Sequence, residues 1–201
     1  MENKLALLAE VGVEPAMIDV DAFALHNAFE VNYPDAMRGL VGLVNLGHEV
    51  TNVNILEDGV PILTRDLPVG TRRFKEDLMR ERGMSASEAD RILQGHETND
   101  ALQPFVQARA EDLSVGIDRA AAFLQTSTRS STGLSRLFTS GGGARIPGLG
   151  KAIADRLRLP VQQANPIERL QVADGVFDAM SVDDIAPLLM LPIGLALRHA
   201  A

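Results

Sequence analysis

The pattern of apolar and polar positions predicts a three-stranded meander near the middle of the chain. Residues 39–46 form an uncharged run of strand-forming residues, typical of a strand that is covered on both faces. Residues 50–56 alternate between polar and apolar side chains. Asp58-Gly59 then favours a hairpin turn, because both central residues of such a turn adopt positive φ. With a third strand at 60–67, we expect an antiparallel sheet.

Helices and further strands are predicted on both sides of this meander. Asp21 is expected to cap a helix over 21–31, and Ser85 with Glu88 forms a capping-box pattern that opens a short helix. Other helices are expected at 4–11, 70–83, 101–126 and 148–159 and from 183 onward, a Ser/Thr-rich loop at 126–132, and other strands at 13–20, 134–139 and near 161. The order of these elements indicates the α/β class.

Charge and composition restrict the function classes. The 201 residues carry a net charge of −8, and a surface of that sign disfavours binding to nucleic acid or to anionic lipid. The absence of cysteine excludes a disulfide scaffold, a thiolate metal site and a cysteine nucleophile. The most apolar stretch, 185–197, is shorter than the roughly 20 residues needed to cross a bilayer, and two prolines interrupt it. We therefore expect a cytoplasmic protein without direct membrane insertion.

The first candidate site is the predicted hairpin from Asn45 to Asn52. Gly47 at the tight turn would let backbone N–H groups approach a phosphate, and Thr51 and Asn52 would add donors. An ordinary hairpin explains the same spacing equally well, so both interpretations stay open.

The second candidate is the segment from Ser140 to Leu149. Glycines 141–143 remove every side chain where a flat ligand could lie, and Pro147 with Gly148 begins a helix whose N-terminus favours a negative group. A flexible connection is the alternative. The segment is not a Walker A loop, because Arg145 stands where that motif requires its first glycine.

Other chemistry finds little support in the sequence. The four histidines show no paired metal spacing, and we identify no metal ligand and no catalytic residue. Asp183-Asp184 is most simply an N-cap. Neither a Gly-x-Ser-x-Gly elbow nor a His-Glu-x-x-His site occurs, so hydrolase chemistry is not indicated.

Taken together, the two glycine motifs resemble the second half of an actin-like ATPase. The likeness narrows to the PilM family of type IV pilus assembly proteins, which is related to the division protein FtsA. Residues 43–56 resemble that family's second phosphate hairpin, 64–70 the strand and glycine before its second-lobe helix, 140–149 its adenosine motif, and 13–25 its return to the first lobe. The resemblance covers nearly the whole chain.

The resemblance implies an actin-like (ribonuclease H-like) α/β fold, mainly the second lobe with a partial first lobe. Residues 1–38 would be the end of an inserted subdomain and a remnant of the first lobe. Residues 39–182 would be the second lobe, with a helical subdomain inserted at 71–130, and 183–201 a helix returning toward the first lobe.

The resemblance also implies a site for ATP or ADP, with Mg²⁺ held through the nucleotide. The implied phosphate-binding residues are Asn45, Gly47, Glu49, Thr51 and Asn52, and the implied adenosine-binding residues are Gly70, Arg73, Gly141, Gly142, Gly143, Arg145 and Ile146.

Two departures from the family pattern qualify these expectations. The first phosphate motif and most of the inserted subdomain are absent, so we expect a fragment, a truncated product, or a missing half supplied by another chain, on which nucleotide binding could depend. Asn45 stands where an acid usually orients the metal, which should weaken Mg²⁺ handling and makes hydrolysis the doubtful part.

The implied function is that of a scaffold, peripheral to the inner membrane through partner proteins. It would dock the N-terminal tail of PilN and link the PilN/PilO platform to the pilus motor ATPases that drive twitching motility. That tail is expected to bind poorly here, because its groove in the family is built by the first lobe and the inserted subdomain.

A homo-oligomer is left open, as are two alternatives: an ATPase or kinase of the same superfamily with Glu49 orienting a water, and an FtsA-like division protein. The absence of a basic amphipathic helix at the end of the sequence counts against the last.

Overall fold

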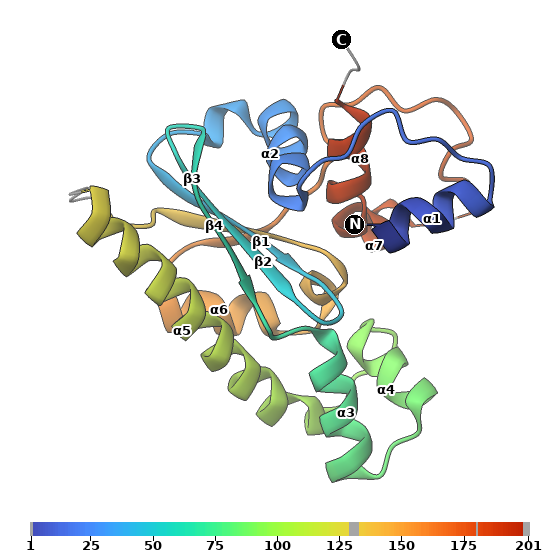
Figure 1. Cartoon of the computed structure of the whole chain (residues 1–201). Helices are drawn as coiled ribbons and strands as arrows, with labels where there is room; N and C mark the ends of the chain where they lie inside the picture. Colours follow the sequence, from blue (N-terminus) through green and yellow to red (C-terminus); the bar gives the residue numbers. More distant parts are fainter. Residues whose placement is uncertain (1, 129–132, 180, 199–201) are drawn as a thin grey trace.

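The computed structural model describes residues 2–128, 133–179 and 181–198, and a mixed sheet of five strands forms its centre (Figure 1). The strand order is β3-β2-β1-β4-β5. The bounds are β1 Leu40–Leu46, β2 Thr51–Glu57, β3 Val60–Leu67, β4 Arg136–Ser140 and β5 Val161–Gln163. The first three strands pair antiparallel, as predicted, whereas β4 pairs parallel to β1 and to β5.

Helices cover both faces of the sheet and one of its ends. The helices are α1 Glu2–Glu10, α2 Asp21–Asn32, α3 Thr71–Arg82, α4 Ala86–Leu93, α5 Gln103–Thr128, α6 Leu149–Leu157, α7 Val182–Ile185 and α8 Met190–Ala196. The 3-10 turns are η1 Pro34–Ala36, η2 Asp100–Leu102, η3 Gly142–Arg145 and η4 Ala186–Leu188. In Figure 1, α5 and α6 lie on one face, α2 and α8 lie on the other, and α3 and α4 stand at one end.

The central strand β1 is buried on both faces, as its uncharged sequence predicted. Val44 and Leu46 point into the core shared with α5 and α6, while Val41 and Leu43 point into the core shared with α2 and α8. Two helical layers therefore fix the position of β1, and with it the position of the turn that follows.

Helix α2 is fixed to the sheet and to α8 by close backbone contacts. The Asn54 Nδ2 donates to the carbonyl oxygen of Ala22 at 3.0 Å, and this connects β2 to the first turn of α2. A Cβ on Gly194 would lie only 1.7 Å from the carbonyl oxygen of Ala24, so α8 can approach α2 this closely only with glycine at that position.

Several local predictions are confirmed. Asp58 and Gly59 both have positive φ, 46° and 82°, as the hairpin turn required. Ser85 and Glu88 form the complete capping box at the start of α4. Helix α3, predicted over 70–83, ends at Arg82 and is followed by Gly83 in the left-handed conformation.

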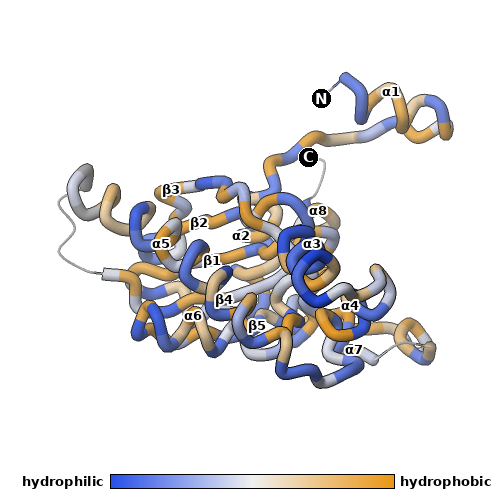
Figure 2. The backbone as a smooth tube through the Cα atoms, turned by 90° about the horizontal axis from the view of Figure 1, so that it is seen from below, coloured by the Kyte–Doolittle hydropathy of each residue, from blue (hydrophilic) through white to orange (hydrophobic). Residues whose placement is uncertain are grey.

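The predicted strand at 13–20 is wrong. Among the described residues, no strand lies beside this segment to accept or donate ladder hydrogen bonds, and its β-branched residues cannot form a strand alone. Val13, Ile18 and Val20 are 50%, 52% and 54% exposed. Figure 2 shows this segment and α1 projecting from the body of the molecule.

The N-terminus of α2 and the C-terminal helix also differ from prediction. Val20 is the cap residue of α2, so the cap predicted at Asp21 is wrong, and Asp21 is the first helical residue. The single helix predicted from 183 is divided into α7, η4 and α8, because Pro187 has no N–H to continue a helical ladder. Ser181 takes the cap position predicted for Asp183-Asp184.

Two predicted segments extend beyond the described residues. Helix α5 continues to Thr128, where a Ser/Thr-rich loop was predicted, and 129–132 of that loop lie outside the description. Residues 199–201 of the predicted last helix also lie outside it. Within the described ranges, every helix is either too short or too polar to cross a bilayer.

Candidate functional site

The turn between β1 and β2 is built against the start of α3. The Gly47 N–H donates to the carbonyl oxygen of Val50 at 3.1 Å, closing the turn. The Thr71 and Arg72 N–H groups donate to the carbonyl oxygens of Gly47 and His48, at 3.0 Å and 2.9 Å. These two N–H groups of α3 are therefore used by the hairpin turn itself.

Gly70 makes this contact possible. A Cβ at position 70 would lie 2.2 Å from the carbonyl oxygen of His48, well inside van der Waals contact. The fully buried Thr51 hydroxyl donates to the carbonyl oxygen of Val69 at 2.6 Å. This bond ties the start of β2 to the segment that leads into α3. In this structure Gly70 and Thr51 join the hairpin to α3, and their predicted ligand contacts stay predictions.

Four polar side chains form a row across the end of the sheet. Ser140, Asn45, Asn52 and Asp66 occupy matching register positions on β4, β1, β2 and β3. The Ser140 hydroxyl donates to the Asn45 Oδ1 at 3.2 Å, the Asn45 Nδ2 donates to the Asn52 Oδ1 at 3.2 Å, and the Asn52 Nδ2 donates to the Asp66 Oδ1 at 2.7 Å. We call these four residues the polar row.

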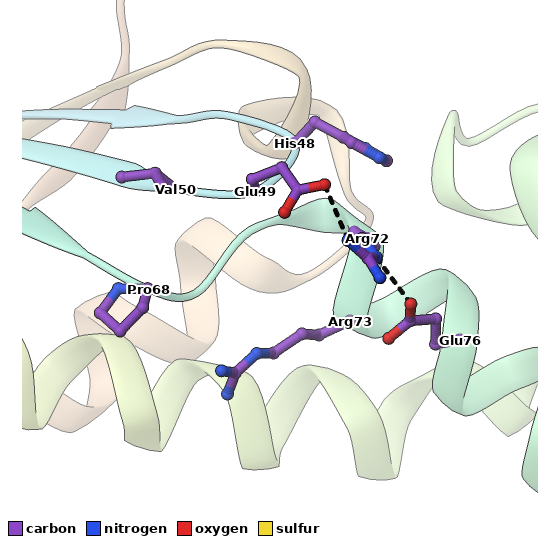
Figure 3. A pocket seen from close by; sticks show the side chains of 7 residues that line it. All are labelled: His48, Glu49, Val50, Pro68, Arg72, Arg73 and Glu76. Carbon is purple, nitrogen blue, oxygen red and sulfur yellow. Dashed lines mark hydrogen bonds and ion pairs between the residues drawn. The ribbon is translucent and has the colours of Figure 1, made fainter.

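A pocket of about 350 Å³ opens beside the hairpin turn (Figure 3). Arg72 lies between two carboxylates, with Nη1 at 2.9 Å from the Glu49 Oε1 and Nε at 2.7 Å from the Glu76 Oε1. The hydrogen bonds that the Arg72 guanidinium donates to Glu76 and then to Glu49 raise its pKa. Arg73 also lines the pocket but points away from both carboxylates in Figure 3. This pocket combines both signs of charge, and of its two arginines Arg72 is already paired with protein carboxylates.

The three consecutive glycines have different surroundings. A Cβ on Gly141 would lie 2.6 Å from the Asn45 Oδ1 and 2.6 Å from the carbonyl oxygen of Leu46, and one on Gly143 would lie 2.6 Å from the Leu46 Cβ. Gly141 and Gly143 therefore allow residues 141–143, which we call the glycine loop, to pack against β1. Among the described residues, only the Leu188 Cδ2 would come within 4 Å of a Cβ on Gly142, at 3.8 Å.

A second pocket, of about 240 Å³, opens at Gly142 between the glycine loop, α3, α4 and η4. Its lining residues are Thr71, Asp90, Leu93, Gln94, Gly142, Arg145, Ile146 and Leu188. A bare backbone wall, two leucines and a few polar groups suit a planar heterocycle with hydrogen-bonding edges. The Arg145 Nη2 lies 3.5 Å from the Asp184 Oδ1, and this ion pair orients the Arg145 guanidinium near the pocket.

The predicted site residues are thus divided among the two pockets, the polar row and a set of close backbone contacts. Glu49 and Arg73 line the first pocket, while Gly142, Arg145 and Ile146 line the second. Asn45 and Asn52 belong to the polar row, and the remaining residues, Gly47, Gly70, Thr51, Gly141 and Gly143, pack the backbone together. Within the described residues, no three His, Asp or Glu side chains are grouped as a metal site requires.

Sequence reasoning missed several residues of these pockets. Arg72 was passed over for its neighbour Arg73, because only the orientation of α3 decides which of the two faces Glu49. The capping box at Ser85 fixes where α4 begins, and this signal could have led to Asp90. No sequence signal pointed to Leu188, which reaches the pocket from the C-terminal segment.

Comparison with solved structures places this architecture among actin-like proteins. The chain is similar to a PilM–PilN type IV pilus biogenesis complex, with 21% identity and a TM-score of 0.83, over 98% of this chain and 56% of that one. It is also similar to the ethanolamine utilization protein EutJ from Carboxydothermus hydrogenoformans, with 20% identity and a TM-score of 0.68, over 98% and 60%. A third match is MreB 5 of Spiroplasma citri bound to AMPPNP, with 13% identity and a TM-score of 0.64, over 98% and 62%.

These matches confirm the predicted actin-like fold. The chain spans little more than half the length of each of these proteins. The family model described as type IV pilus assembly protein PilM matches residues 1–200. The chain therefore belongs to the family of the type IV pilus assembly protein PilM.

Proposed function

We propose that this chain is a nucleotide-binding scaffold of type IV pilus assembly. The observation that carries the proposal is the pocket at Gly142, where one glycine of three leaves its backbone open between Leu93, Leu188 and polar groups. An adenine ring fits such a wall, and Arg145, Ile146 and Gly142 would contact the adenosine of ATP or ADP.

The phosphates would extend from this pocket toward the hairpin turn. Thr71 lines the adenosine pocket, and the next residue, Arg72, lines the pocket beside the turn, so the start of α3 connects the two. In this arrangement Asn45, Gly47 and Glu49 lie on the phosphate side, and Mg²⁺ would be held through the nucleotide. Residues 39–182 would then form the second lobe, with 71–130 as its helical insertion, flanked by first-lobe elements at 1–38 and 183–201.

We propose a scaffold rather than an efficient ATPase. The Glu49 carboxylate, which could orient an attacking water, is paired with Arg72 at 2.9 Å. Asn45 supplies a neutral oxygen where a carboxylate would orient a metal. Both features favour binding over hydrolysis.

The partner would be the cytoplasmic tail of PilN, since a similar solved structure is a PilM–PilN complex. Through PilN, the protein would lie at the inner membrane and link the PilN/PilO platform to the motor. Because the chain spans 56% of that PilM chain, we expect the isolated chain to bind the tail weakly. Low-micromolar affinity for a PilN tail peptide would contradict this.

The nucleotide proposal is tested by Gly142→Val, with fluorescent ADP as the probe. In the described part of the chain, a Cβ at position 142 would meet only the Leu188 Cδ2, at 3.8 Å, and a valine side chain there would occupy the pocket that Gly142 lines. The protein should therefore fold while its ADP affinity falls at least about tenfold, or about 1.4 kcal/mol.

Gly150→Val is the matched control. Gly150 lies in α6, outside the pocket, and within the described ranges a Cβ there would meet only the Val161 Cγ1, at 3.9 Å. The affinity of this variant for ADP should therefore be unchanged. A folded Gly142→Val protein with normal ADP affinity would overturn the adenosine assignment. A parent chain that binds no ADP would overturn nucleotide binding by this chain.

A further inference from the structure

We propose that Asp66 is a positioning residue for Asn45. Its carboxylate acts through Asn52, fixes the Asn45 amide with Oδ1 toward the glycine loop, and disfavours an acidic residue at position 45. We call the hydrogen bonds that connect Asp66 through Asn52 to Asn45 the relay, and the relay depends on the polar row alone. What it would do to a bound ligand depends in addition on the proposed nucleotide site.

The carboxylate of Asp66, at the end of the polar row, determines which group donates and which accepts in each hydrogen bond of the row. An ionised carboxylate only accepts hydrogen bonds, so the atom of Asn52 that faces Asp66 must be Nδ2, and their 2.7 Å contact is the shortest in the row. The Oδ1 of Asn52 must then face Asn45, which requires Nδ2 of Asn45 there. The remaining atom, the Asn45 Oδ1, faces the Ser140 hydroxyl.

The glycine loop is built around that oxygen. A Cβ on Gly141 would lie 2.6 Å from the Asn45 Oδ1, so the loop packs directly on it. Ser140, which donates to this oxygen, is only 4% exposed. Asp66 itself is exposed on the edge strand, two strands away from the residue that it orients. An outer carboxylate thus determines which atom the central strand presents to the loop.

This relay makes an acid at position 45 incompatible with the acid at position 66. A carboxylate at 45 would face the Asn52 Oδ1, placing two acceptors together without a hydrogen. Turning the Asn52 amide over would move the same conflict to Asp66. An amide side chain at position 66 removes the conflict, because its NH₂ group could donate to the Asn52 Oδ1, and the Asn52 Nδ2 could then donate to a carboxylate at 45.

The relay is tested by a double-mutant cycle of Asn45→Asp and Asp66→Asn, measured as the thermal midpoint of the 201-residue chain without nucleotide. With Asp66 present, Asn45→Asp should lower the midpoint by about 5 °C, because an acceptor loses its donor. In the Asp66→Asn background, the same change should lower it by less than about 1 °C. Equal losses in both backgrounds would overturn the proposal.

Two controls separate the relay from simple charge repulsion. In about 1 M salt, where exposed charges are screened, the difference between backgrounds should persist, and its disappearance would overturn the relay. Asn54→Asp is the matched control, because the Asn54 amide bonds to the carbonyl oxygen of Ala22 and lies outside the row. Its midpoint loss should be the same with either residue at 66, and rescue of Asn54→Asp by Asp66→Asn would count against a specific relay.

A ligand measurement tests the consequence for the site. Fluorescent ADP should bind the parent chain with little dependence on Mg²⁺, whereas the double variant, with a carboxylate at 45, should bind about tenfold tighter with Mg²⁺ than without. If the double variant bound ADP equally well with and without Mg²⁺, the proposed consequence of the relay for the ligand site would be overturned.

The two proposals can fail separately. Coupling in the midpoints without ADP binding would sustain the relay and overturn the proposed function. ADP binding without coupling would sustain the function and overturn the relay.

Discussion

The hairpin turn and the glycine loop meet at the same end of the sheet, but they use glycine for opposite purposes. At the hairpin, Gly70 brings α3 against the turn, and the polar groups around it bond to the protein. At the loop, Gly142 leaves an open backbone wall beside a pocket. A glycine-rich motif therefore indicates a close approach of backbone, and only the neighbouring atoms tell whether the approaching group is protein or ligand.

The loop itself contains both kinds of glycine. Gly141 and Gly143 resemble Gly70, since a Cβ at either position would overlap the end of β1. Gly142, between them, faces the pocket. Three consecutive glycines in the sequence thus correspond to two packing positions and one position that lines a pocket.

The largest expected effect separates these two kinds of glycine. Gly70→Ala should lower the free energy of unfolding by about 3 kcal/mol, because the new methyl group meets the carbonyl of His48 at 2.2 Å. Gly142→Ala should change it by less than about 0.5 kcal/mol. Urea denaturation measures both, and similar costs for the two variants would remove the distinction.

A smaller effect is expected where the hairpin uses its own hydroxyl. Thr51→Val keeps the shape but leaves the carbonyl oxygen of Val69 without its donor, which should cost about 2 kcal/mol. Thr126→Val is the control, since the Thr126 hydroxyl bonds to the carbonyl oxygen of Phe123 at the exposed surface of α5 and should cost less than about 0.5 kcal/mol. If Thr51→Val were as mild as its control, the hairpin would not depend on this bond.

The last effect is expected at Tyr33, outside both motifs, and is confined to alkaline pH. Burial raises the pKa of the Tyr33 hydroxyl to about 12, and the Asn165 N–H donates to this oxygen at 2.8 Å. Because the folded pKa lies above the usual value near 10, the neutral form contributes stability that is fully present below about pH 10. That contribution is lost as the pH rises toward about 12.

The measurement benefits from the composition of the chain. Tyr33 is its one tyrosine, so ultraviolet absorbance reports this hydroxyl alone. We expect its titration near pH 12 in the folded chain and near pH 10 in urea. Tyr33→Phe should remove this part of the alkaline loss of stability, and a folded-state titration near the usual value would contradict the assigned burial.

Local sequence signals predicted most of the fold and some of the residues that line the two pockets. The meander, the Asp58-Gly59 turn and the Ser85–Glu88 capping box depend on neighbours within a few residues, and all three are present. The strand predicted at 13–20 failed, because a strand needs a partner that its own sequence cannot specify. The single C-terminal helix failed at Pro187, although the missing donor was visible in the sequence.

The sequence by itself determined that two glycine motifs would follow buried strands, because strand burial and turn conformation are set by short-range patterning and by φ. Only the tertiary structure decided which glycine faces a pocket, which arginine meets Glu49 and which way the Asn45 amide points. Those outcomes depend on groups brought together from distant positions: Leu188 beside Gly142, α3 against the hairpin turn, and Asp66 two strands from Asn45. Contacts of that kind arise from packing and hydrogen-bond direction in three dimensions, which no local pattern of residues encodes.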